Sequence, residues 1–133
     1  MGRRVKSKNH ITYDCHYHVV WVTKYRLPLL VDGADEELKS IIYRVAEEHD
    51  AHIESIEVMP DHVHVVVESY PHTIRDVVRK FKGRSSRELR ERFSHIKRRT
   101  PSLWTRSYFI ATTGGAPLKA IKKYVESQKL RKS

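Results

Sequence analysis

Two short alternating segments separated by three residues constrain the fold of this 133-residue chain more than any other feature. Residues 52–58 (HIESIEV) and 62–68 (HVHVVVE) are rich in β-branched residues and have the pattern of strands. The connection between them, MPD, leaves room only for a tight turn, so the two strands are predicted to be antiparallel neighbours.

Three helices and two more strands complete the predicted fold. Residues 12–23 (TYDCHYHVVWVT) have the composition of a long strand, and residues 102–113 contain a fourth one. Apolar residues spaced by 3 and 4 indicate amphipathic helices over residues 35–50, from residue 73 to about 93, and over residues 117–131. The order β-α-β-β-α-β predicts an α+β, ferredoxin-like split βαβ fold with a four-stranded antiparallel sheet, followed by a C-terminal helix.

The ends of the helices are predicted from short polar residues and glycines. Asp32 or Asp35 is expected to cap the first helix, and Thr73 with Asp76 resembles a capping box at the start of the second. The pair at 114–115, two glycines before the last helix, provides either a loose joint or a simple turn.

Length and composition predict one domain over residues 1–133, with a basic arm over residues 1–11. The single cysteine, Cys15, cannot form an internal disulfide. No secretory signal follows the basic N-terminus, and no apolar stretch approaches the ~18 residues of a membrane span. We therefore expect a cytoplasmic protein with no membrane partner.

The charge of the chain favours a polyanionic partner. Twenty-six Lys and Arg residues against 16 Asp and Glu residues give a formal net charge of +10, with the cations concentrated in GRRVKSK, RKFKGRSSRELRERFSHIKRR and KAIKKYVESQKLRKS. Such segments bind polyanions by releasing counterions, and nucleic acid is the usual partner. A solubilising surface or an affinity for anionic lipid are the alternatives.

Two histidines in the second hairpin strand are candidate metal ligands. His62 and His64 lie two residues apart, so they share one face of the strand, opposite the valines at 63, 65 and 67. Two imidazoles on one face can bind the same divalent cation. The alternative is a pair of half-exposed histidines on the open side of the sheet.

A second pair, His16 and His18, has the same spacing in the first strand, and spacing alone does not rank the two pairs. If both strands present their histidines to one face, four rings can cluster. Glu68 shares the face of His62 but lies six residues, roughly 20 Å, along the strand, too far to share a metal with it.

The last helix carries a tyrosine and a glutamine on one side. Tyr124 and Gln128 are separated by four residues, so they lie one above the other, at the margin of the stripe formed by Ile121 and Val125. Taken alone, this pattern is typical of a boundary tyrosine and a solvated glutamine.

Several stretches together resemble the single-tyrosine HUH (His-hydrophobic-His) transposases of the smallest bacterial and archaeal insertion sequences. They are YHVVWVTKYR (17–26), MPDHVHVVVE (59–68), FKGRSSRELR (81–90), LWTRSYFIATTGG (103–115) and IKKYVESQ (121–128). The resemblance extends from about residue 13 to residue 128, and no motif position departs from it.

This resemblance implies a homodimer whose active site combines the histidine pair of one subunit with the tyrosine helix of the other. It implies that His62, His64 and Gln128 bind a divalent metal, Mg²⁺ or Mn²⁺, and that Tyr124 is the nucleophile. His18 matches the family motif without an assigned catalytic role.

The implied activity is transposition by cleavage and rejoining of single-stranded DNA, without ATP and through a covalent 5′-phosphotyrosine. The substrate is a strand with a folded hairpin at the end of an insertion sequence. A free tyrosine has a pKa near 10, and ionising it at pH 7 costs about 4 kcal/mol. No neighbour of Tyr124 in the sequence is an obvious base, so the metal is expected to supply most of the assistance.

Binding of DNA is expected to use cationic side chains of the second helix, the last strand and the last helix. These are Arg75, Arg79, Lys80, Lys82, Arg84, Arg87, Arg106, Lys122 and Lys123, with Arg3, Arg4 and Lys6 of the arm. Trp104, Tyr108 and Phe109 beside Arg106 are candidate surfaces for stacking bases, or core residues of the strand.

Two alternative functions remain at this point. The first is a nucleic-acid-binding module of the same fold without catalysis. The second is a domesticated HUH relative, a nickase that acts on chromosomal repeats or in replication. Formation of a covalent protein–DNA adduct separates the first alternative from a transposase, and the DNA that flanks the gene separates the second.

Overall fold

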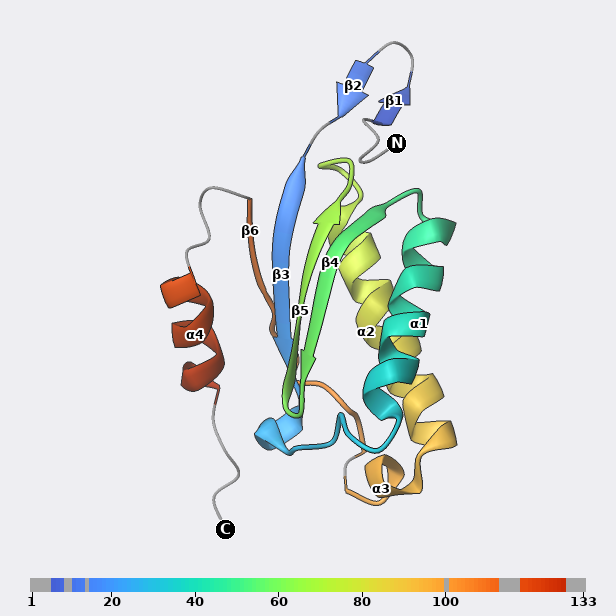
Figure 1. The fold of residues 1–133 in the computed structure, drawn as a ribbon, viewed down its shortest axis with the longest axis vertical. Coiled ribbons are helices and arrows are strands. Elements are labelled where there is room, and N and C mark those ends of the chain that lie inside the picture. Colours follow the sequence, from blue (N-terminus) through green and yellow to red (C-terminus); the bar gives the residue numbers. More distant parts are fainter. Residues whose placement is uncertain (1–5, 9–10, 14, 100, 113–117, 129–133) are drawn as a thin grey trace.

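The computed structural model describes residues 6–8, 11–13, 15–99, 101–112 and 118–128. Four strands form one antiparallel sheet, with two long helices on one face and a third helix on the other (Figure 1). The elements are β1 Lys6–Lys8, β2 Ile11–Tyr13, β3 His16–Val22, the 3₁₀ turn η1 Lys24–Arg26, α1 Ala34–Glu48, β4 His52–Met59, β5 His62–Glu68, α2 Ile74–Arg92, α3 Ser94–Lys97, β6 Phe109–Thr112 and α4 Leu118–Ser127.

The sheet has the strand order β4-β5-β3-β6, and all three pairings are antiparallel. When the four strands are numbered 1 to 4 along the chain, they therefore lie side by side in the order 2-3-1-4, with α1 and α2 as the two crossover helices. The predicted ferredoxin-like α+β fold is confirmed, including the tight hairpin between β4 and β5.

The main core lies between the sheet and helices α1 and α2. Alternate residues of β3 and β5 point to this side, and Val19, Trp21 and Val65 are fully buried there. The ring of Trp21 stacks on Phe81 of α2 at 5.8 Å between centroids and meets Trp104 edge-on at the same distance. These aromatic contacts fix the position of α2, which continues through Gly83 as predicted.

Helix α4 covers the opposite face of the sheet (Figure 1). Its residues Ile121 and Val125 pack on Val20 and Val22 of β3, and these four residues form a separate, smaller apolar cluster. The amphipathic pattern predicted for the last helix is therefore confirmed, and its apolar stripe contacts the face that carries the histidines.

The predicted strand over residues 12–23 is divided in two. The strand β3 begins at His16, which pairs with Glu68, the last residue of β5. Just beyond this pair, the backbone N–H of Ser69 donates to the carbonyl of Cys15, and Ile11–Tyr13 pair with Lys6–Lys8 in a separate two-stranded sheet. The predicted basic arm therefore contains a strand of its own.

Neither α1 nor α2 has the side-chain cap predicted for it. The N-cap of α1 is Gly33, with φ of 98°, rather than Asp32 or Asp35: Asp32 lies one residue earlier in the turn, and Asp35 lies in the first turn of the helix. Thr73 is the N-cap of α2 as predicted, but its hydroxyl donates to the carbonyl of Tyr70 instead of capping the helix.

Several smaller features complete the comparison with the sequence. The turn η1 and the short helix α3 were not predicted. The fourth strand occupies only Phe109–Thr112, and an isolated bridge joins Trp104 to Thr23. The glycines at 114–115 and the start and end of the predicted helix 117–131 lie outside the described residues. Among the helices in the described ranges, none has the length and apolar character needed to cross a membrane.

Candidate active site

The two histidines of β5 lie on the face of the sheet that α4 covers. His62 pairs with Val22 and His64 with Val20 across the β3–β5 ladder, while the intervening valines point into the main core. Both imidazoles line one cavity of about 400 Å³ between the sheet and α4. The prediction that they share a face is confirmed.

The same cavity contains charged groups from the body of the fold and from α4. Its polar lining consists of the two histidines with Arg26, Glu57, Asp61, Lys122 and Glu126. It therefore combines imidazoles and carboxylates that suit a cation with cations that suit a phosphate.

Asp61 orients the first histidine. Its Oδ1 lies 2.8 Å from Nδ1 of His62, and its Oδ2 accepts a hydrogen bond from Nε of Arg26 at 3.4 Å. When Nδ1 of His62 donates its proton to this carboxylate, the lone pair of Nε2 remains available. This carboxylate–histidine arrangement is typical of histidines that bind metal ions.

The second histidine contacts a third imidazole. Nε2 of His64 lies 3.0 Å from Nδ1 of His18 on the adjacent strand, and Nδ1 of His64 lies 3.9 Å from Oε1 of Glu57. Burial, followed by the nearby ring of His18, lowers the pKa of His64 below its usual value. A neutral His64 retains a lone pair for a metal ion.

The rival histidine pair on β3 does not converge. His18 points toward His64, whereas Nδ1 of His16 lies 2.6 Å from Oε2 of Glu54 at the other end of the strand. The expectation that four rings can cluster is therefore wrong, because His16 has a carboxylate partner of its own. Glu68, as expected, does not line the cavity of the other two histidines.

These residues fit a divalent metal ion as an incomplete ligand set. Among the described residues, no three His, Cys, Asp or Glu side chains are grouped so that they could hold an ion. His62 and His64 therefore need a further donor of another kind, or one from another chain, to complete a site. A glutamine amide is a donor of that kind.

Tyr124 and Gln128 meet at one serine. The Oη of Tyr124 lies 2.9 Å from Oγ of Ser107. The Ser107 hydroxyl also donates to Oε1 of Gln128 at 3.3 Å. The ring of Tyr124 lies against Phe109, with 5.6 Å between centroids. Burial raises the pKa of Tyr124, and the hydrogen bond with Ser107 opposes this effect in part. The predicted i, i+4 pairing on one side of the helix is confirmed.

The tyrosine and the histidines lie on opposite flanks of α4. Ile121 and Val125 sit over β3, while the ring of Tyr124 leans toward β6 and the cavity with the histidines lies toward β5. Because β5 and β6 flank β3, about two strand spacings, or roughly 10 Å, separate the two groups. Within one chain, neither Tyr124 nor Gln128 lines the histidine cavity.

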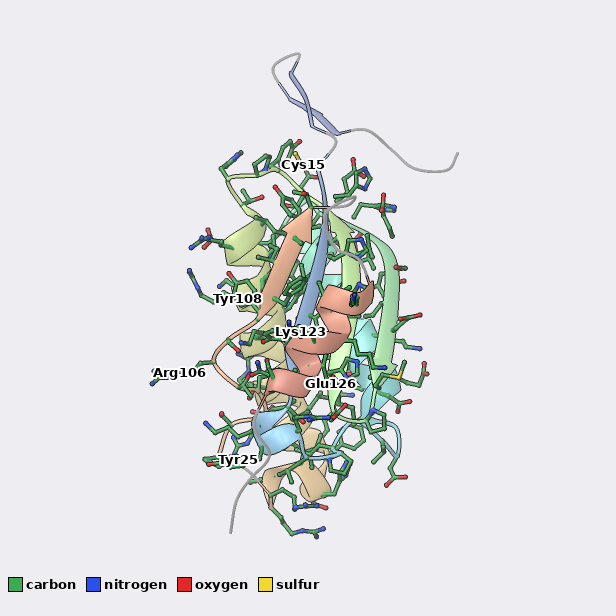
Figure 2. The ribbon with its side chains drawn as sticks, turned by 90° about the vertical axis from the view of Figure 1, so that its left-hand side faces the viewer. Cys15, Tyr25, Arg106, Tyr108, Lys123 and Glu126 are labelled. Atoms are coloured by element: carbon green, nitrogen blue, oxygen red, sulfur yellow. The ribbon has the colours of Figure 1, made fainter. Side chains whose placement is uncertain are left out.

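The cationic residues predicted to bind DNA fall into separate groups. Arg75, Arg79, Lys82 and Arg106 line a cavity of about 440 Å³ between α2 and residues 102–108. Lys80, Arg84 and Arg87 lie with Arg79 along another side of α2. Lys122 lines the histidine cavity, and Lys123 is exposed on α4 (Figure 2).

Among these cations, Lys82 and Arg84 make the most hydrogen bonds with protein groups, and Arg79 makes one with Asp76. The Nζ of Lys82 donates to the carbonyls of Thr105, Arg106 and Ser107 at 2.8, 2.9 and 3.0 Å, and burial lowers its pKa to about 8. Arg84 forms two hydrogen bonds with the carboxylate of Glu48. These contacts occupy hydrogen-bond donors that would otherwise be available to DNA phosphates.

The aromatic residues considered for base stacking also differ in their surroundings. Trp104 is buried and its Nε1 donates to Oγ of Ser85, and Phe109 packs against Tyr124. Tyr108 is half-buried, with the ammonium of Lys82 5.6 Å from its ring centroid. For Trp104, the alternative of a core residue is confirmed.

Three residues of the site have no signal in the sequence pattern that identified the histidines. Asp61 follows a proline in a turn, Arg26 lies in the unpredicted turn η1, and Ser107 precedes β6. Of the three, Asp61 is the one that sequence adjacency to His62 can indicate. Ser107 and Arg26 reach the site only through tertiary pairing.

Comparison with known proteins identifies the family. Residues 11–128 match the family described as "Transposase IS200 like". The chain is 34% identical over 127 residues to the ISDra2 transposase TnpA of Deinococcus radiodurans, covering 93% of this chain and 91% of that protein. It is 30% identical over 126 residues to the transposase of insertion sequence element IS200 from Salmonella typhimurium, covering 92% and 82% of the two chains.

The fold comparison agrees with the sequence comparison. A crystal structure of a Deinococcus radiodurans R1 protein assigned as a transposase superposes with a TM-score of 0.85 at 34% identity, covering 96% of this chain and 100% of that one. With its ferredoxin-like sheet, paired histidines and C-terminal tyrosine helix, this chain belongs to the IS200-like transposase family.

Proposed function

We propose that this transposase cleaves and rejoins single-stranded DNA through a covalent bond to Tyr124, at a divalent metal site formed by His62, His64 and Gln128. The observation that carries the proposal is the histidine cavity. It holds two imidazoles beside the helix that bears the tyrosine: one is oriented by Asp61, and the other has its pKa lowered by burial.

In this reaction the Oη of Tyr124 forms a bond to a backbone phosphorus, and the bond from that phosphorus to the 3′-oxygen breaks. The phenol gives up a proton and the departing 3′-oxygen takes one up, so no proton is consumed and no ATP is needed. The 5′ side of the break stays joined to Tyr124. Attack by another 3′-hydroxyl reverses these steps and rejoins a strand.

Bound Mg²⁺ or Mn²⁺ would supply charge neutralisation at the phosphate. The protein contributes the orientation of the ligands: Asp61 holds the ring of His62, and burial lowers the pKa of His64, which favours its unprotonated form. Gln128 is the proposed third donor, since its side-chain oxygen lies on the same side of α4 as the phenol.

The phenol of Tyr124 lies against Ser107, where burial raises its pKa and so favours the protonated form. That position also lies across α4 from the histidines. We therefore propose that Tyr124 reacts after α4 has moved away from Ser107, and that it does so at the histidine cavity of a partner subunit in a homodimer. Among the described residues, this movement has to open the small cluster formed with Val20 and Val22, the hydrogen bonds to Ser107 and the contact between Tyr124 and Phe109.

A Tyr124→Phe variant tests the chemical step, with Tyr43→Phe on the exposed surface of α1 as the matched control. The substrate is a hairpin-bearing single strand from the ends of the element, incubated with Mg²⁺ or Mn²⁺. On a denaturing gel, the wild type and the control are expected to form a covalent adduct, and Tyr124→Phe none while still binding the DNA. No adduct with the wild type would leave a non-catalytic binding module.

Mixed dimers test whether the site is shared. Neither His62→Ala nor Tyr124→Phe alone is expected to cleave. Mixing them should restore up to one functional composite site per heterodimer, because one subunit supplies the tyrosine and the other the histidines. Manganese binding, measured by electron paramagnetic resonance, should disappear in His62→Ala and persist in Tyr124→Phe.

A further inference from the structure

The turn η1, Lys24–Arg26, connects the histidine cavity to a second cavity and has no role in the reaction described above. Two consecutive non-glycine residues adopt left-handed backbone there, Tyr25 with φ of 59° and Arg26 with φ of 55°. L-residues rarely adopt this conformation, and a pair in sequence requires support from the surrounding structure.

That support comes from Thr23 and from residues 103–105. The Oγ1 of Thr23 donates to the carbonyl of Leu27 at 2.7 Å, and the backbone N–H of Lys24 donates to the carbonyl of Leu103 at 2.8 Å. Thr23 also pairs with Trp104. The turn is therefore held against the segment that leads to Ser107.

Arg26 projects from one side of this turn into the histidine cavity. Its Nε contacts Oδ2 of Asp61, whose other oxygen contacts His62, so one carboxylate sets the positions of both side chains. This contact uses the Nε donor, and the two terminal nitrogens of the guanidinium suit a phosphate.

Lys24 and Tyr25 lie on the other side of the turn. They line a cavity of about 320 Å³ with Thr105, Arg106, Ser127 and Gln128. The Nζ of Lys24 lies 5.9 Å from the ring centroid of Tyr25. Figure 2 shows Tyr25 below α4 and Arg106 projecting to one side, so the cavity opens near the C-terminal end of the tyrosine helix. An aromatic ring beside cationic side chains is a typical surface for a single-stranded base.

We propose that the Lys24–Arg26 turn is a binding site for the DNA strand at the point of cleavage. Arg26 binds the scissile phosphate inside the histidine cavity, and Tyr25 stacks on the adjacent base in the cavity on the other side of the turn. The left-handed backbone directs the two successive side chains to these two places. The assignment of this phosphate as scissile rests on the proposed function; the binding site itself does not.

A neutralisation scan tests the phosphate contact by binding alone, in the full-length Tyr124→Phe protein that cannot cleave. Each phosphate of a single-stranded oligonucleotide is replaced in turn by a methylphosphonate, and affinity is measured. One replacement is expected to weaken binding about 10-fold, as for the loss of one charge-assisted hydrogen-bonded contact. Adding Arg26→Gln should abolish this sensitivity, while Arg44→Gln on α1 should retain it.

An abasic scan tests the base contact in the same way. Removal of the base beside the sensitive phosphate is expected to weaken binding about 10-fold. Tyr25→Ala should remove that effect and Tyr43→Ala should not. Arg26→Lys, which keeps the charge and loses the planar fork, should show a weaker form of the phosphate effect if Arg26→Gln fails to fold.

The proposal is wrong if Arg26→Gln weakens binding equally for every modified strand, or leaves the sensitive phosphate unchanged. Failure of the proposed chemistry has a different signature. In that case the Arg26-dependent phosphate and the Tyr25-dependent base are found, but the wild-type protein forms no adduct at that phosphate on a denaturing gel.

Discussion

The two faces of the sheet are built in different ways. The face under α1 and α2 is continuous and apolar, with Trp21 and Phe81 fully buried at its centre. The face under α4 has four buried apolar residues, flanked by histidines and carboxylates on one side and by Tyr124 on the other. We therefore expect the face under α1 and α2 to hold the fold together, and the face under α4 to change its contacts without unfolding the chain.

The largest effect is expected on the apolar face under α1 and α2. Phe81→Ala removes a buried ring that stacks on Trp21, and it is expected to lower the free energy of unfolding by about 3–5 kcal/mol. Urea denaturation followed by circular dichroism measures this change. A loss below about 1 kcal/mol would show that the face under α1 and α2 does not dominate stability.

The second prediction concerns Lys82, which joins α2 to the segment that carries Ser107. Lys82→Met leaves three carbonyls without their ammonium donor, and it is expected to lower the free energy of unfolding by about 1.5–3 kcal/mol. The salt dependence of DNA binding should change little. Arg75→Gln, the exposed control on the same helix, should instead reduce that slope by about 0.7 with no loss of stability.

The pH dependence of Lys82 sharpens this test. Its pKa in the folded protein is about 8, below the ordinary 10.5, so between these values the unfolded chain binds more protons than the folded one. The stability of the wild type relative to Lys82→Met should therefore rise from pH 8 to pH 10.5, and this gain should be lost as the pH falls through 8. A flat or falling difference would contradict the burial of the ammonium.

A smaller effect on stability is expected on the face of the sheet under α4. Ile121→Ala truncates one of the two α4 residues that are buried against β3. The helix α4 can then leave the sheet, so that no cavity has to remain. We expect a loss of global stability below about 1 kcal/mol, since the cost of truncation depends on how well a site can relax. Hydrogen exchange should become faster in residues 118–128 and stay unchanged in α1. Protection lost equally in both helices would show that the two faces unfold together.

The same contrast explains what the sequence could predict. The faces of β3 and β5 follow from alternation, which is a local property, so the shared face of His62 and His64 was predictable. The position of Tyr124 across α4 depends on Ser107, which no pattern connects to it. The division of the first strand depends on where β5 ends, at Glu68, and therefore on pairing between distant segments.

Arg26 shows the limit most clearly. Its place in the histidine cavity depends on two left-handed residues, which are neither glycine nor asparagine, and on a carboxylate 35 positions away. Sequence alone identified basic segments by their density, and an isolated arginine in a turn has no such signal. A residue placed by a left-handed backbone, as Arg26 is, therefore escapes patterns of periodicity and charge density.

The position of Tyr124 beside Ser107 can be tested through the pKa of its phenol. Burial raises the pKa of this phenol above its ordinary value of 10.0. The free energy that favours Tyr124 in its position beside Ser107 is therefore fully present below pH 10 and is lost as the pH rises through the raised pKa. The ultraviolet absorbance of tyrosinate, wild type minus Tyr124→Phe, should show a phenol that titrates above 10. Ser107→Ala removes the bond that lowers this pKa, so the titration should move further upward while Phe109 still covers the ring. A phenol that titrates at its ordinary value in the wild type would mean that Tyr124 does not rest on this flank of the sheet.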